Sequence, residues 1–145
     1  MEVEQLARFL EQQGCRLRGC SEQQVDLIEQ HFAVKLPSTY VAFLLRMGKE
    51  AGSFMLGSSA FYDEIYSLRE YAIELLAENN FKPLPDNAFV FFMHQGYQFG
   101  FFDVSEGDNP PVYYYNEGNE QTDFMKEASL AAFFDIQLIL SGFKL

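Results

Sequence analysis

The sequence contains no tryptophan, only two histidines and two cysteines, and none of the short motifs that identify the common catalytic or nucleotide-binding sites. The patterns GxSxG, HExxH, GxGxxG and the P-loop are all absent. So few histidines and cysteines also make a poor ligand set for a structural zinc site. The sequence therefore predicts a protein that is not an enzyme and has no metal site and no cofactor.

The chain also lacks a long hydrophobic run and a basic, apolar leader. No stretch approaches the roughly 18 apolar residues that a membrane-spanning helix needs. The first residues, MEVEQLARFLEQQ, have an acidic amphipathic pattern that differs from a signal peptide. We therefore expect a soluble cytoplasmic protein. Cys15 and Cys20 are expected to be free thiols, because a reducing compartment and their short separation give little reason for a disulfide.

Basic residues are scarce, with 10 lysines and arginines against 21 aspartates and glutamates, for a net charge of -11. Residues 1–50 hold seven acids and six bases, whereas residues 51–145 hold fourteen acids and four bases. A negative field repels nucleic-acid phosphates and anionic lipids, and it attracts basic partners. The negative charge therefore predicts that the protein binds neither nucleic acid nor a membrane. An acidic surface that only keeps the protein soluble is the alternative interpretation.

The chain has enough apolar side chains for one hydrophobic core. Its 145 residues are 48% hydrophobic and include 16 phenylalanines and eight tyrosines, which suits a single domain over residues 1–145. Capping boxes at Ser21 with Gln24 and at Ser67 with Glu70 mark two helix starts. Helical spacing of apolar residues predicts five helices, at residues 2–12, 21–32, 38–47, 67–78 and 129–140.

Two residues have specific expected roles in these helices. Gly48 follows the third helix, where a glycine in the left-handed conformation is a common C-terminal cap. Tyr71 is expected on the buried face of the fourth helix, since it lies at helical spacing from Leu68 and Leu75.

Between the helices the hydrophobic period changes to two, which is typical of strands. Residues 88–94 are apolar on both faces, as in a central strand covered from both sides. In the next strand Tyr97, Phe99 and Phe101 are expected to point inward. The predicted strands are 88–94, 97–103 and 112–116, with two short strands around residues 57–59. This order of elements predicts an α+β fold with an antiparallel sheet and helices mainly on one side.

The middle helix has an acidic polar face. Glu70, Glu74 and Glu78 are spaced by four, so they form one stripe, and like charges at this spacing cost a few tenths of a kcal/mol per pair. Such a stripe is either a solvated helix face or a surface that meets a basic partner. Asp63 and Glu64 are expected to extend it. As neighbours in a strand they would point to opposite faces and would not form an acid/base pair.

Tyrosines and the tip of the hairpin provide further candidate contacts. The segment VYYYN places Tyr113 and Tyr115 on the face opposite to their middle neighbour, so both faces are covered or an aromatic patch is exposed. The tip HQGYQ contains a lone histidine, His94, whose ordinary role is that of a hydrogen-bonded polar residue. We interpret the tip as a turn at the rim of a binding face, with Tyr97 and Gln98 as contacts.

The order of these motifs resembles the SUKH superfamily, which includes yeast cell-wall-assembly regulators of the Smi/Knr type and bacterial immunity proteins. The segment FAVKLPSTYVAFLLRMG resembles its signature, and FVFFMHQGYQFGFFDV, PPVYYYNEG and SLAAFFDIQLI resemble its central hairpin, next strand and closing helix. The matching signature residues are Glu29, Leu36, Pro37, Tyr40, Phe43, Leu44 and Gly48.

The resemblance implies a curved antiparallel sheet, no known catalytic activity and a role in binding other proteins. In bacteria that role is typically the neutralisation of a secreted toxin. The chain is thus expected to be an immunity protein that binds a cognate toxin, for example a nuclease whose basic active site an acidic surface would match. The alternative is a regulatory module that binds a cellular protein or peptide.

Overall fold

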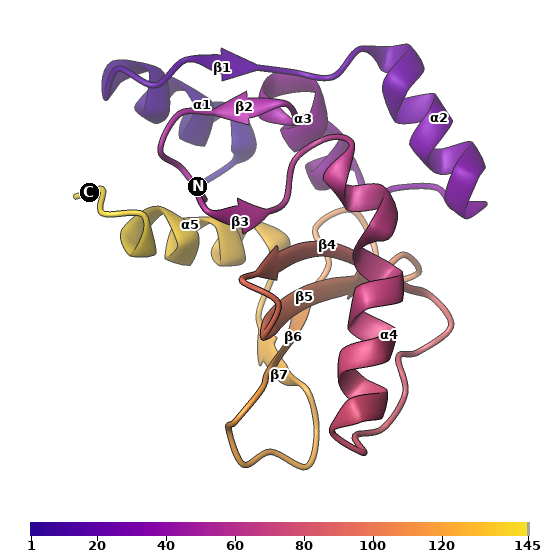
Figure 1. Ribbon diagram of the computed structural model, residues 1–145. Helices are drawn as coiled ribbons and strands as arrows, with labels where there is room; N and C mark the ends of the chain where they lie inside the picture. Colours follow the sequence, from indigo (N-terminus) through magenta and orange to yellow (C-terminus); the bar gives the residue numbers. More distant parts are fainter. Residues whose placement is uncertain (145) are drawn as a thin grey trace.

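The computed structural model describes residues 1–144, and their helices and strands form an α+β fold (Figure 1). The five predicted helices are all present and their ends shift by at most one residue. They are α1 Val3–Gln12, α2 Glu22–Phe32, α3 Ser38–Met47, α4 Leu68–Glu78 and α5 Leu130–Leu140. The buried apolar side chains of the described residues form one continuous core.

The strands form a two-stranded and a five-stranded antiparallel sheet, the latter in the order β3-β4-β5-β6-β7. The predicted strands 88–94 and 112–116 are confirmed, and the predicted strand 97–103 is present but begins at residue 98. Strand bounds are β1 Leu17–Arg18, β2 Glu50–Ala51, β3 Ser58–Ser59, β4 Ala88–His94, β5 Gln98–Asp103, β6 Val112–Asn116 and β7 Met125–Glu127.

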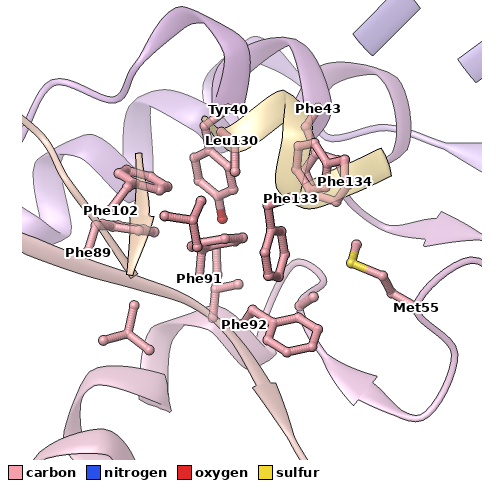
Figure 2. Close-up of a cluster of buried hydrophobic side chains, with 14 of the residues drawn as sticks. Tyr40, Phe43, Met55, Phe89, Phe91, Phe92, Phe102, Leu130, Phe133 and Phe134 are labelled. Carbon is pink, nitrogen blue, oxygen red and sulfur yellow. The ribbon is translucent and has the colours of Figure 1, made fainter. Parts of the chain in front are cut away.

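Strand β4 contains a bulge at Phe91. Val90 pairs with Phe101 and Phe92 pairs with Gly100, so Phe91 is the extra residue. A bulge of this kind directs consecutive side chains toward the same side of a sheet. Both Phe91 and Phe92 accordingly contact Phe133 of α5, with ring centroids 5.3 Å apart in each case (Figure 2).

One face of the sheet packs against α3 and α5 through aromatic rings. Tyr40 of α3 lies 5.2 Å from Phe102 and 5.9 Å from Phe91, and Phe43 stacks on Phe134 of α5 at 4.8 Å (Figure 2). Rings at these separations add to the stabilisation from buried area.

The opposite face is covered by α4 and by the segment that follows it (Figure 1). On this side Phe81 packs against Tyr115 at 4.9 Å and against Phe124 at 5.2 Å, and Phe124 packs against Phe101 at 5.0 Å. Because both faces are covered, β4 is apolar at nearly every position, as predicted. The helices lie mainly on the face of the sheet that packs against α3 and α5, whereas α4 lies on the opposite face.

The segment before α4 differs from its prediction. A single strand, β3, replaces the two short strands expected around residues 57–59, and Glu64–Ser67 forms a 3-10 helix that leads into α4. Asp63 and Glu64 are therefore not strand neighbours. The predicted capping box at Ser67 and Glu70 is absent, because Ser67 has helical φ and ψ angles, whereas a capping residue is extended. Its hydroxyl donates to the Glu64 carbonyl instead.

Three single-residue predictions are also wrong. Gly48 has a φ of -65°, not a left-handed angle, and glycine is needed there because a Cβ atom would lie 2.6 Å from the Leu44 carbonyl oxygen. Tyr71 is 55% exposed, since the buried face of α4 is formed by Leu68, Ala72, Leu75 and Leu76 and leaves Tyr71 at its edge. Tyr97 is 38% exposed because it belongs to the turn before β5 and not to the strand.

Both cysteines are free thiols in the structure, in agreement with the prediction. Cys20 is buried beside α3, and its backbone N–H donates to the Leu44 carbonyl at 2.7 Å. Burial raises the pKa of the Cys20 thiol. The thiol therefore resists the ionisation that makes cysteine reactive.

The hydroxyl of Tyr40 has no hydrogen-bond partner among residues 1–144, although the residue is fully buried among phenylalanine rings (Figure 2). Burial raises the pKa of Tyr40 well above its usual range. An unpartnered buried hydroxyl costs about 1–3 kcal/mol. We expect Tyr40→Phe to raise the free energy of unfolding by about 1 kcal/mol, measured by urea denaturation.

The matched control for this change is Tyr113→Phe. The hydroxyl of Tyr113 donates to Glu106 Oε1 at 3.0 Å, so its removal should lower the free energy of unfolding by about 0.5 kcal/mol. A clear loss of stability in Tyr40→Phe would show that its hydroxyl has a favourable partner.

Candidate functional site

Helix α4 presents a row of exposed acidic residues. Glu70, Glu74 and Glu78 are exposed on its outer side. Asp63 and Glu64, also exposed, precede its first turn through the 3-10 helix. We call these five residues the α4 acidic face. None of them forms an ion pair with another residue of the 1–144 range, so their negative charges remain available to a partner.

The basic residue within α4 does not compensate the α4 acidic face. Arg69 of α4 points toward the sheet, where its guanidinium donates to the Ala88 carbonyl. At the other end of the helix, the Asn79 amide donates to Glu117 Oε2 at 2.8 Å, which brings a further carboxylate near Glu78. The negative surface thus extends from the start of α4 past its end.

A second feature is a cavity of about 510 Å³ between the tip of the β4–β5 hairpin and the end of α5. We call it the hairpin-tip pocket. Its apolar lining comprises Met55, Leu56, Phe92, Tyr97 and Leu140. Leu56 is 76% exposed and Leu140 is 72% exposed, so the apolar lining continues onto the outer surface.

Polar groups complete the lining of the hairpin-tip pocket without adding any Asp, Glu, Lys or Arg side chain. His94 Nδ1 lies 2.9 Å from the Ser58 hydroxyl, and this hydrogen bond joins β3 to β4. A serine beside a histidine is one part of a nucleophile–base arrangement. Within residues 1–144 no carboxylate hydrogen-bonds to the His94 ring to orient it. The hydrogen bond of this pair links the two strands.

The structure separates the predicted contact residues into three places. Tyr97 and Gln98 line the hairpin-tip pocket, away from the α4 acidic face. Tyr113 is half-buried, stacks on Phe101 at 5.3 Å and bonds Glu106. Tyr115 is 4% exposed, so it belongs to the core and cannot contact a partner in this conformation. Alternation along β6 explains why Tyr113 and Tyr115 lie on the same face of the sheet. It does not explain why Tyr115 is the more buried of the two, which depends on the packing of Phe81 against Tyr115.

The signature residues have structural roles. The Glu29 carboxylate accepts a hydrogen bond from the Leu36 backbone N–H at 2.7 Å, which fastens the end of α2 to the segment before α3. Tyr40, Phe43 and Leu44 are at most 1% exposed. The signature residues thus help to determine how α2 and α3 pack.

The family model of the SMI1 / KNR4 family (SUKH-1) matches residues 19–135. The chain belongs to this family. The matched range runs from before α2 into the first half of α5 and includes the signature and the hairpin, so the resemblance to SUKH proteins is confirmed. No curated protein matched the chain. SUKH-1 membership is consistent with an immunity-type or Smi/Knr-type role in protein interaction.

Two further observations concern metals and membranes. Among the described residues, no group of three or more histidine, cysteine, aspartate or glutamate side chains is arranged to hold a metal ion. Within the same residues, none of the helices is both long and apolar enough to span a membrane.

Sequence reasoning did not identify the hairpin-tip pocket, although it pointed to two of its residues. Leu56, Gln137 and Leu140 come from segments far apart in the chain, so no spacing rule connects them. One signal was present: Gln137 is an uncharged polar residue in the apolar run FFDIQLIL, where an amide is unexpected on a buried helix.

Proposed function

We propose that this SUKH-1 chain is a non-catalytic binding domain, spanning residues 1–145, that neutralises a cognate toxin in the cytoplasm. The observation that carries the proposal is the α4 acidic face, whose five exposed carboxylates have no ion-pair partner among the described residues. Family membership supports a protein as the partner.

The chemistry of the α4 acidic face favours a basic toxin surface. Unpaired carboxylates attract cations over about 8 Å at physiological ionic strength. A nuclease must bind phosphate, so its active site is basic, and a row of carboxylates can occupy it in place of the nucleic acid. Such an inhibitor needs no catalytic group, because occupying the active site is sufficient.

The direct test pairs the chain with a toxin domain encoded beside its gene. Co-expression should restore growth of cells that produce the toxin, and the purified proteins should form a stable complex. A toxin that remains fully active, and does not bind, would reject that pairing.

Charge reversal tests the surface itself. We expect Glu70→Lys combined with Glu74→Lys to slow association with the verified partner by about tenfold or more, because the long-range attraction is lost. Dissociation should change less, and the wild-type association rate should fall steeply as salt is added. Stopped-flow or surface plasmon resonance measures both rates.

The matched control is Glu22→Lys combined with Asp26→Lys on α2. These two acids are also exposed, four residues apart and outside any ion pair of the described residues. The first helix offers no such control, because Glu4 and Glu11 both pair with Arg46. Equal slowing by both double variants would show that α4 has no special role and that only net charge matters.

The second candidate function is a regulatory module that binds a cellular protein or peptide. The uncharged lining of the hairpin-tip pocket favours it, because binding there needs no electrostatic attraction. A verified partner whose association rate does not change with salt would support this function over toxin neutralisation.

A further inference from the structure

We infer that the hairpin-tip pocket is a second contact site, which receives one uncharged apolar side chain of a protein partner together with its peptide group. The inference rests on the proposal that the chain binds a protein, but it does not depend on the α4 acidic face or on a toxin as the partner.

The side chain of Gln137 is the main evidence that the pocket binds a ligand. It is only 8% exposed, lines the hairpin-tip pocket, and no hydrogen bond of its amide is found within residues 1–144. The positions around it in α5 are apolar, so an apolar residue would pack there without leaving an amide unpaired. Gln98 places a second amide, also without a side-chain hydrogen bond among the described residues, on the same pocket.

An amide matches a peptide group. The glutamine side chain offers N–H donors beside a carbonyl acceptor, and a peptide backbone presents the complementary acceptor and donor. An ion would be a poor ligand, because the described lining contains no Asp, Glu, Lys or Arg side chain to pair with it and the protein's net charge of -11 repels anions. The polar part of the ligand is therefore neutral.

The rest of the pocket fits an apolar side chain. Met55 and Phe92 are buried at 3% and 2% exposure and provide apolar walls, and a volume of about 510 Å³ is enough for one side chain with its flanking peptide groups. Leu56 and Leu140 extend beyond the cavity as exposed apolar surface, which a protein segment would cover and a small free molecule would not.

Nuclear magnetic resonance with capped tripeptides tests the inference without a known partner. The ¹⁵N-labelled chain is titrated with acetyl-Gly-Leu-Gly-amide, and with the same peptide containing Lys or Glu in place of Leu. We expect saturable shifts of the Gln137 side-chain amide and of the Tyr97 and Leu140 backbone amides at roughly millimolar leucine peptide. The two charged peptides should bind at least tenfold more weakly. Equal shifts for all three peptides, or none, would overturn the inference.

Variants separate recognition from simple packing. Gln137→Leu keeps an apolar helix position but removes the amide, so the affinity for the leucine peptide should fall about fivefold to tenfold. Leu140→Ser should also weaken binding several-fold, whereas Leu27→Ser, on an exposed leucine of α2, should leave it unchanged. Unchanged or tighter binding of the leucine peptide by Gln137→Leu would show that the Gln137 amide does not contact the peptide group.

Isovaleramide distinguishes a protein segment from a small molecule, since it has the leucine side chain's branched shape and an amide but no flanking peptide groups. It should bind at least tenfold more weakly than the tripeptide, and equal affinity would make the pocket a small-molecule site. The tripeptide result is independent of toxin binding. Failure of the toxin pairing would therefore not contradict this inference, and failure of the tripeptide to bind would not contradict toxin neutralisation through the α4 acidic face.

Discussion

Gly19→Ala is expected to lower the free energy of unfolding by at least about 4 kcal/mol, which would leave little folded protein. A Cβ atom on Gly19 would lie 1.7 Å from the Leu45 carbonyl oxygen and 2.5 Å from its carbonyl carbon. The neighbouring Cys20 N–H donates to the Leu44 carbonyl of α3, so moving the segment outward would also break this hydrogen bond. Urea denaturation followed by circular dichroism measures the loss.

Gly57→Ala is the matched control. Gly57 has a φ of +88° and open space around its Cβ position, so alanine there meets backbone strain but no clash. Such strain costs about 1–2 kcal/mol. If both alanine variants lose the same stability, the segment at Gly19 can move away from α3 and the close contact is not essential.

Phe91→Ala is expected to cost about 3–5 kcal/mol of unfolding free energy. Phe91 is 1% exposed and its ring lies 5.3 Å from the rings of both Phe102 and Phe133 (Figure 2). Removal of its ring leaves a cavity between the sheet, α3 and α5, and the surrounding side chains can close it only partly.

Two variants bracket this result. Tyr71→Ala removes a ring that is 55% exposed, and the free energy of unfolding should change by no more than about 0.5 kcal/mol. Phe91→Leu should cost about 1.5 kcal/mol, which keeps the comparison measurable if Phe91→Ala does not fold. A loss below about 1 kcal/mol in Phe91→Ala would show that the bulge does not direct this ring into the core.

Helices and central strands were predictable because their signals are local. The apolar stripe of α3 and the double-sided apolar run of β4 depend on side chains within one element. The segment around Asp63 was not predictable in the same way. Its capping box and second strand had local support, but the 3-10 helix that leads into α4 supplied a different start to the helix.

The candidate contact residues also differ in whether their exposure depends on local sequence or on distant elements. Exposure of Glu70, Glu74 and Glu78 follows from the amphipathic pattern of their own helix. The depth of Tyr115 depends on Phe81 and Phe99, which lie on other elements. The hairpin-tip pocket depends on three segments at once, so Gln137 could be noticed as an unusual residue in an apolar run but could not be placed beside Tyr97.

The sequence by itself determined the α+β class, the five helices, the antiparallel hairpin, the negative charge and the SUKH resemblance, because each depends on composition, spacing or motif order. The tertiary structure alone decided which tyrosines are buried, why Gly19 and Gly48 must be glycine, and how the hairpin-tip pocket is assembled. These properties depend on distances between residues far apart in the chain, and hydrophobic periodicity contains no information about such distances.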